Sequence, residues 1–379
     1  MRRIRSGALV AALALCTVVF SGVAGAETRG YVISDFHTAT YADKLSCIHG
    51  SNGTSVDIRR RVLLRMGYTT ARANQLLIDE KDNAGVSVED LLLHRGVHSS
   101  KVDPYNNPQD AVDPKIKLAG GRYAPGFDLD DDPNTGFEDP ESHQRGVDNN
   151  LFRALGCFDS YHLNLPTHPM YEHVMWDTLF DTMPAWVIYV TGRTLTANGP
   201  VEVTFDRATQ HPRRNTSGGA LVNTTFLVET PSRSKSTFTG EIRDGFIYIN
   251  NGTMSLEGES PILTKLDLHN FHARIKIESD GSLSGLIGGY QPWMDIFYMV
   301  SSAMEIQIGL DIPGIYYAFK SLADHAPDPV TGNNLEISGA YRIVAVPAFL
   351  ASLNGAVFAT GADGSQLVSK VAGPGLKSQ

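Results

Sequence analysis

The chain of 379 residues is long enough to bury a sizeable core, and it carries a net charge of −9. This negative charge is spread through the chain, which excludes the basic face that nucleic-acid binding requires. The same charge balance favours the binding of cations.

Residues 1–26 match the three-part pattern of a cleavable secretory signal. Three arginines precede an apolar run of about 13 residues, and the small residues Ala24 and Ala26 form the cleavage motif. The run is shorter than the roughly 20 residues that a helix needs to span a bilayer. Cleavage after Ala26 predicts a periplasmic or secreted protein, and no later segment of the mature chain is apolar enough to span a membrane.

The mature chain retains two cysteines, Cys47 and Cys157, because Cys16 leaves with the signal. Two cysteines in an oxidising compartment most simply pair with each other. The alternatives are two free thiols or metal ligands, but the chain has no CxxC or CxxCH motif. We therefore expect a disulfide bond that closes a loop of about 110 residues.

The region 27–166 is predicted to be loop-rich with short helices. Helical spacing of apolar residues indicates helices at 56–66 and 70–80. A long stretch rich in Pro, Asp, Asn and Gly follows at 98–145, and a stretch of that length without periodicity is either functional or disordered. Asp148 is predicted to cap the short helix that comes next.

An acidic segment within that stretch is the clearest candidate site. Oxygen-bearing side chains recur at alternate positions, and further carboxylates follow, so the predicted ligands are Asp128, Asp130, Asp132 and Asn134, with Glu138 or Asp139 completing the shell. Calcium takes six to eight oxygen ligands, which suits such a cluster. Asp148 and Asp159, from the next element, are further candidates.

This segment is not an EF-hand, because Pro133 stands where the sharp turn of that motif needs glycine. The alternative is a solvated loop whose Asp and Asn residues only form turns. Carboxylates so close together repel one another, however, and calcium is abundant outside the cytoplasm. We predict one calcium ion with a structural role.

A second candidate metal site contains His162, His168 and His173, with Met170 and Met175 close to them in the sequence. Imidazole and thioether ligands together favour copper, and imidazole also suits zinc. The spacing matches no zinc motif, and the methionines also fit the apolar side of a helix. The alternative function is therefore a periplasmic metal-dependent enzyme, a hydrolase or redox protein, that uses these histidines with His37.

The region 167–290 is predicted to be an antiparallel β domain, either a sandwich or an open barrel. Its strongest signals are Asp-Gly pairs at 244–245 and 280–281, each flanked by strand-like runs, which indicate hairpins. A C-terminal helical segment at 291–352 and a flexible tail at 353–379 complete the chain. The predicted fold class is α+β.

Three stretches together resemble a family of uncharacterised exported bacterial proteins. They are DFHTATY at 35–41, the acidic loop leading to GVDNNLFRALGC at 146–157, and GLIGGY at 285–290. The resemblance implies export and a link between the acidic loop and Cys157. It implies no activity and no catalytic residue.

No nucleophile or nucleotide-binding motif is present in the sequence. We therefore predict an exported, non-enzymatic protein with a binding or envelope-associated role. In that role the β domain would present Trp186, Trp293 or Tyr290 on its surface to a polysaccharide or an envelope protein.

Overall fold

A computed structural model gives the fold of residues 26–88, 107–162, 164–165, 168–229, 232–260, 263–301 and 309–361. For residues 164–165 and 168–175 it describes the backbone alone. Apart from Ala26, the predicted signal lies outside the described residues, as does the predicted tail beyond residue 361.

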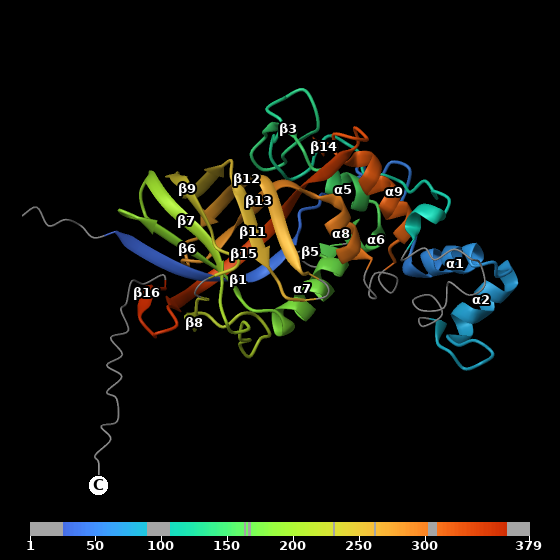
Figure 1. Cartoon of the computed structure of the whole chain (residues 1–379), viewed down its shortest axis with the longest axis horizontal. Coiled ribbons are helices and arrows are strands. Elements are labelled where there is room, and N and C mark those ends of the chain that lie inside the picture. The colour runs from blue at the N-terminus through green and yellow to red at the C-terminus, as the bar shows by residue number, and fades with distance from the viewer. Residues whose placement is uncertain are drawn as a thin grey trace, which may run out of the picture.

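Eight antiparallel strands close into a barrel (Figure 1). In sheet order they are β1 (Glu27–Thr38), β6 (Trp186–Gly192), β7 (Gly199–Arg207), β9 (Ser236–Arg243), β10 (Phe246–Asn250), β12 (Lys265–Ile277), β13 (Leu283–Pro292) and β15 (Asn334–Ala351). The barrel closes because β1 pairs with β6 on one side and with β15 on the other. The antiparallel β domain is thus confirmed, and the predicted sandwich or open barrel is corrected to a closed barrel.

Shorter strands lie beside the barrel. Four of them extend its sheet, namely β8 (Thr225–Leu227), β11 (Thr253–Glu257), β14 (His325–Pro327) and β16 (Val357–Ala359). The others form two small separate ribbons, β2 (Phe137–Glu138) with β3 (Arg145–Val147) and β4 (Asn164–Leu165) with β5 (His168–Pro169).

Two barrel strands lie where the sequence predicted other structure. β1 falls in the region expected to be loop-rich, and β15 falls in the segment 291–352 that was expected to be helical. β15 is 18 residues long and buried over most of its length, because the barrel core covers one face while β8 and β16 cover part of the other. Burial on both faces removes the apolar–polar alternation that identifies a strand in sequence.

The two predicted Asp-Gly hairpins are confirmed. The first joins β9 to β10, and φ is positive at both Asp244 (52°) and Gly245 (80°). Such dihedral angles are typical of the two-residue turn that matches the twist of paired strands. The second hairpin, at 280–281, joins β12 to β13.

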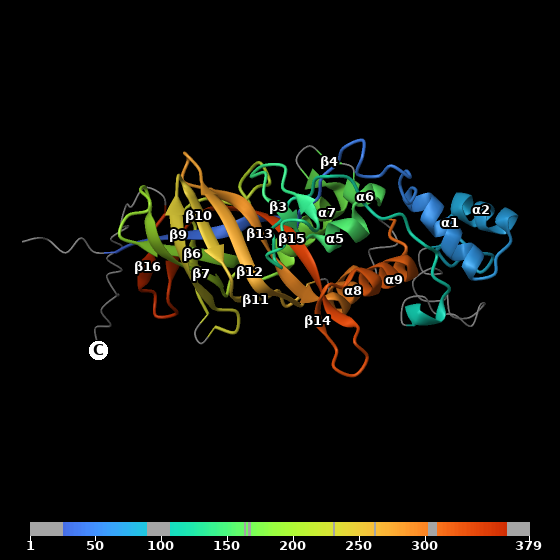
Figure 2. The same ribbon diagram turned by 90° about the horizontal axis from the view of Figure 1, so that it is seen from above.

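Helices gather at one end of the barrel (Figure 2). They are α1 (Ser55–Arg65), α2 (Thr70–Asp79), α5 (Asn150–Leu155), α6 (Asp159–His162), α7 (Met170–Thr182), α8 (Trp293–Val300) and α9 (Ile312–Leu322), with a 3-10 turn at Pro108–Asp110. The predicted helices at 56–66 and 70–80 are confirmed as α1 and α2, which share a small apolar cluster of their own. Of the helices described, none is both long and apolar enough to cross a bilayer.

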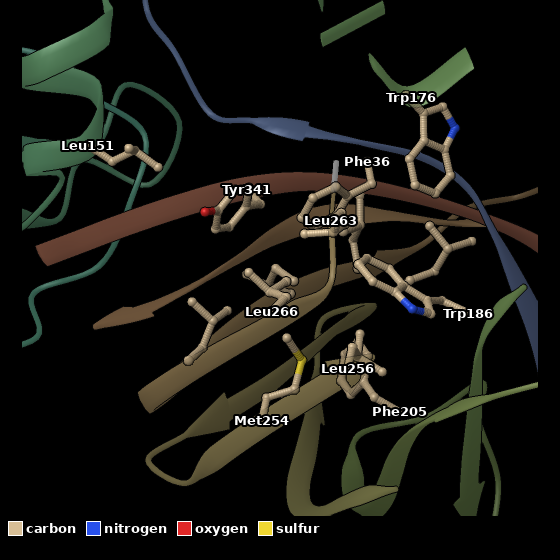
Figure 3. Packing of buried hydrophobic residues seen from close by; sticks show 14 of the residues in the cluster. Phe36, Leu151, Trp176, Trp186, Phe205, Met254, Leu256, Leu263, Leu266 and Tyr341 are labelled. Atoms are coloured by element: carbon tan, nitrogen blue, oxygen red, sulfur yellow. The ribbon is translucent and has the colours of Figure 1, made fainter. Parts of the chain in front are cut away.

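The barrel interior is filled by large side chains (Figure 3). Phe36 of β1 stacks on Tyr341 of β15, with ring centroids 4.9 Å apart, and meets Trp186 of β6 edge-on at 5.3 Å. These contacts join the first, second and last strands of the barrel through one aromatic group. The closure of the barrel is therefore supported by packing as well as by backbone pairing.

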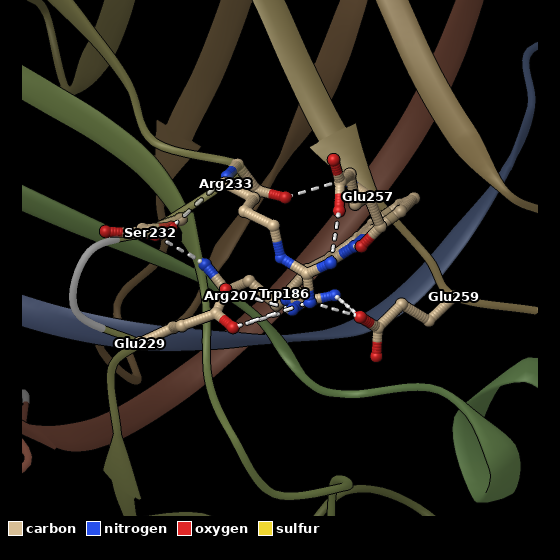
Figure 4. Close-up of polar contacts among 9 residues, drawn as sticks. Trp186, Arg207, Glu229, Ser232, Arg233, Glu257 and Glu259 are labelled. Atoms are coloured by element: carbon tan, nitrogen blue, oxygen red, sulfur yellow. Dashed lines mark hydrogen bonds and ion pairs between the residues drawn. The ribbon is translucent and has the colours of Figure 1, made fainter.

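A buried arginine joins the end of β7 to two neighbouring segments (Figure 4). Arg207 is 3% exposed, and its guanidinium lies 2.9 Å from carboxylate oxygens of both Glu229 and Glu259. The more exposed Arg233 pairs with the same carboxylate oxygen of Glu259 as Arg207 does. Since each buried charge has an opposite partner, the group is structural and leaves no free cation for a ligand.

Candidate metal site in the acidic loop

The acidic loop at 126–148 is anchored to the outer surface of the barrel. Phe127 and Leu129 are buried in an apolar cluster with residues of β13 and β15, namely Leu286, Tyr290 and Ala340. The side-chain amide of Asn270, on β12, donates a 2.8 Å hydrogen bond to the carbonyl oxygen of Leu129. The start of the loop is therefore held in place by the barrel wall.

The sequence predicted that Asp148 caps α5, but the structure shows that it does not. The cap is Asn149, whose side-chain oxygen accepts a 3.0 Å hydrogen bond from the backbone N–H of Phe152. The carboxylate of Asp148 instead accepts backbone N–H bonds from Leu129 at 2.8 Å and Asp130 at 3.3 Å. Because Asn149 caps the helix, the carboxylate of Asp148 lies against the acidic loop.

Three carboxylates then converge, from Asp128, Asp130 and Asp148, and we call them the acidic trio. One oxygen of each lies within 4.8 Å of those of the other two, and no other such group of His, Cys, Asp and Glu occurs among the described residues. Oxygen Oδ1 of Asp128 is buried and has no hydrogen-bond partner in the described part of the chain. A cation between these oxygens would satisfy that atom.

The raised pKa values of two members of the trio also favour a bound cation. Burial, followed by the charges of Asp130 and Asp324, raises the pKa of Asp148 to about 7. Burial and the neighbouring charge of Asp130 also raise the pKa of Asp128. Crowded carboxylates resist ionisation in this way until a positive charge offsets their repulsion.

Gly146 makes the close approach of the chain segments possible. A Cβ atom at this position would lie 2.6 Å from the carbonyl oxygen of Asp132 and 2.8 Å from Oδ2 of Asp128. Its φ of 79° is also one that residues with a side chain rarely adopt. A glycine is therefore required where β3 passes the acidic segment.

The other predicted ligands have different partners. Oδ1 of Asp132 accepts the backbone N–H of Asn134 at 3.0 Å, as in a local turn. Glu138 pairs with Arg122 at 2.7 Å. Of the six residues first predicted, the structure brings together two, with Asp148 as the third member. Asp159, the other further candidate, lies in α6 and is not part of the group.

Asp139, the last predicted ligand, is fully buried and contacts Arg274 of β12 at 3.0 Å. It also accepts bonds from the backbone N–H and the hydroxyl of Ser142. Its charge is therefore balanced by an arginine that lies 135 residues away in sequence, which local spacing could not reveal.

The chemistry of the trio suits a hard cation. It offers only carboxylate oxygens, the ligands that calcium and magnesium prefer, and no imidazole or thiolate that would select zinc or copper. Asp128 and Asp130 stand at alternate positions, and the short ribbon of β2 with β3 returns the chain so that Asp148 joins them. The residues present fit one calcium ion with further oxygens supplied by backbone or water.

The histidine cluster is described only in part. Nδ1 of His162 lies 3.7 Å from Sγ of Cys47 and 3.2 Å from the carbonyl oxygen of Gly156. The side chains of His168 and His173 lie outside the described residues. His37 is 6% exposed and lies 3.5 Å from its neighbour Asp35. The enzyme alternative based on these histidines stays a prediction.

A second polar cluster, which no sequence pattern indicates, surrounds Glu336. The buried carboxylate of Glu336 lies 2.5 Å from Nδ1 of His269 and 2.7 Å from Nδ1 of His325. The ring of His325 stacks on Tyr290 at 4.1 Å. These residues come from β12, β13, β14 and β15, and no local pattern links them. The cluster ties the short strand β14 to the barrel wall.

The aromatic residues proposed for partner binding are buried. Trp186, Trp293 and Tyr290 are 1%, 7% and 4% exposed. They contribute to the core and its margin, so none of the three forms a surface platform for a polysaccharide.

The predicted disulfide bond between Cys47 and Cys157 is confirmed, with Cα atoms 5.6 Å apart. Cys157 is fully buried directly after α5, and its carbonyl oxygen accepts the backbone N–H of Asn52 at 2.8 Å. The bridge therefore fastens the segment that leads into α1 to the helical end of the barrel.

Comparisons with models of known protein families, with curated proteins and with solved structures find no match to this chain.

Proposed function

We propose that this is an exported, non-enzymatic protein in which one structural calcium ion orders the acidic loop against the barrel. The observation that carries the proposal is the acidic trio, whose oxygens lie within 4.8 Å of one another. No described Lys, Arg or His pairs with these three carboxylates, whereas the neighbouring Glu138 and Asp139 each have an arginine. A metal ion supplies the positive charge that the trio lacks.

Export is supported first by the disulfide bond. A disulfide bond persists in oxidising compartments, where calcium is also plentiful. The predicted signal at 1–26 and the resemblance to exported bacterial proteins agree with this location. We propose a binding or envelope-associated role, in which the calcium ion and the disulfide bond keep the long N-terminal connections in one conformation.

Thermal melting of the mature protein tests the calcium site. In millimolar calcium we expect a melting temperature at least about 5 °C higher than in EDTA, because an ion that binds only the folded state stabilises it. Asp148→Asn should abolish most of this shift. Asp131→Asn is the matched control, since Asp131 is exposed, lies in the same loop outside the trio, and has a φ of 58° that asparagine tolerates. Identical melting in calcium and EDTA would refute the proposal.

Calcium affinity should depend on pH in a defined direction. Burial and neighbouring charge raise the pKa of Asp148 to about 7, so a proton competes with the ion for this carboxylate. We expect affinity to fall about tenfold for each pH unit below about 7 and to level off above about 8. Without calcium, the stability of the fold changes with pH in the opposite direction. The raised pKa of Asp148 means that the folded state loses stability as pH rises towards and through 7.

Calorimetric titration with calcium between about pH 5.5 and 8.5 measures this dependence. Asp131→Asn serves again as the control and should follow the wild-type profile. A calcium affinity that does not change below neutral pH would show that Asp148 is not a ligand, even if calcium binds elsewhere.

A further inference from the structure

A small apolar chamber lies where the helices meet the barrel. It is lined by residues of β1, β12, β15, α5, α6, α7 and α8 and by Leu263, and its free space is about 30 Å³. Phe36, Leu263 and Tyr341, which line it, are drawn in Figure 3. Most of its wall is hydrocarbon or aromatic, and the residues with a hydroxyl group are Thr38, Tyr161 and Tyr341.

A second cavity of about 20 Å³ adjoins the chamber. The two share four lining residues, Leu263, Leu266, Ile296 and Met299. This second, outer cavity also has a polar margin, formed by Lys265, Asp267 and Asp295. Lys265 is already paired with Asp267 at 2.7 Å. Asp295, in the first turn of α8, has no ion-pair partner among the described residues. The two cavities thus run from an acidic margin to an apolar interior.

Gln291 lines the outer cavity and carries an unpaired donor. The residue is 3% exposed, and its Oε1 accepts a 2.7 Å hydrogen bond from the hydroxyl of Tyr341. No acceptor for its Nε2 exists among the described residues. An unpaired buried donor is costly, so native structures rarely keep one that nothing satisfies.

The neighbouring strand leaves room for this amide. A Cβ atom at Gly339 of β15 would lie 2.5 Å from Nε2 of Gln291. Any other residue at this position would displace the amide, so the glycine allows the donor to stay in place. The orphan donor thus occurs at a position where the backbone is shaped to accommodate it.

We infer that the two cavities form a binding site for a small neutral amphiphile. Its carbonyl oxygen would accept the hydrogen bond from Nε2 of Gln291, and its alkyl part would occupy the apolar chamber. The acidic margin disfavours a carboxylate head, since Asp295 would repel it. An aliphatic ketone, ester or amide has the required chemistry.

Met299 controls how long a ligand can be. It lines both cavities and is partly exposed, and its unbranched side chain adapts easily. The free space holds only a few heavy atoms, so a longer alkyl chain enters by displacing this side chain. Met299→Ala should therefore strengthen the binding of a medium-length ligand.

Titration of the mature protein with 2-octanone, monitored by calorimetry and by tryptophan fluorescence, tests the site. We expect saturable binding and a change in emission, because Trp176 lines the chamber. Octanoate, which has the same chain length but a charged head, should bind at least tenfold more weakly. Gln291→Leu should weaken the binding of 2-octanone at least tenfold, while Ser284→Ala, on the same strand but away from both cavities, should not.

Three outcomes would overturn the inference. The first is that the wild type shows no saturable binding of 2-octanone, which would mean that only a water molecule accepts the hydrogen bond from Nε2 of Gln291. The second is binding that neither Gln291→Leu nor Met299→Ala alters, which would place the ligand elsewhere. The third is tighter binding of octanoate than of 2-octanone. If Gln291→Leu does not fold, the Met299→Ala comparison and the pair of probes still decide the question.

Discussion

Replacement of both Cys47 and Cys157 by serine is expected to lower the free energy of unfolding by about 3–5 kcal/mol. The bridge joins residues separated by 110 positions, and a cross-link over so long a loop removes much conformational freedom from the unfolded chain. Cys157 is also fully buried, so the substitution places a hydroxyl in an apolar cluster that contains Phe137 and Phe152. Denaturant unfolding of the oxidised mature protein and of the double variant measures the difference.

Reduction of the wild type is the control for this prediction. A reductant should shift the unfolding midpoint of the wild type towards that of the double variant, and it should leave the double variant unchanged. If the reductant does not alter the midpoint of the wild type, the bridge makes no contribution to stability. Calcium should be kept constant, because an ion that binds the folded state would add its own stabilisation.

Features of the fold that arise from short-range pattern could be predicted from the sequence. The turn at Asp244 and Gly245 needs only two residues with positive φ, and the helices α1 and α2 need only apolar spacing and a cap. The disulfide followed from counting cysteines after the signal is removed. The turn and the helices depend on residues that are close in sequence. The disulfide is the simplest pairing because the mature chain has only two cysteines.

Closure of the barrel could not be predicted in this way. It depends on β1 pairing with β15, as in Ile33 opposite Ala345, which are about 310 residues apart. Neither strand shows a clear alternation, because each is buried over most of its length. Pairings at such distance are specified by the whole core, to which Phe36, Trp186 and Tyr341 belong, and not by local sequence.

The same distinction holds at the candidate site. Asp128 and Asp130 were predicted because ligands at alternate positions can converge. Asp148 was only an additional candidate, since its approach depends on the ribbon of β2 and β3 and on Asn149 taking over the cap of α5. The partner of Asp139 could not be found, because Arg274 comes from a distant strand of the barrel.

Asp139→Asn is expected to destabilise the protein by about 3–5 kcal/mol, because it leaves the buried Arg274 without its main counter-charge. Burial alone would raise the pKa of Asp139, but the hydrogen bonds from Ser142 and the charge of Arg274 outweigh it and hold the pKa below its usual value. The stabilisation is therefore present above the pKa of the unfolded chain and is lost as pH falls through the lower, folded value. Urea unfolding at neutral pH measures the loss.

Glu141→Gln is the matched control, since Glu141 also contacts Arg274, at 3.4 Å, but its side chain is 55% exposed. An exposed partner of this kind contributes at most about 1 kcal/mol, so this variant should unfold almost like the wild type.

Calcium then separates the two roles that an aspartate of this loop can have. Asp139→Asn should lower stability by the same amount in calcium and in EDTA, because its partner is an arginine. Asp148→Asn should lower stability in calcium alone, because its proposed partner is the ion. Loss of the calcium response in Asp139→Asn would instead assign Asp139 to the ligand shell, as the spacing of the acidic segment first predicted, and would mean that the loop rearranges when the ion binds.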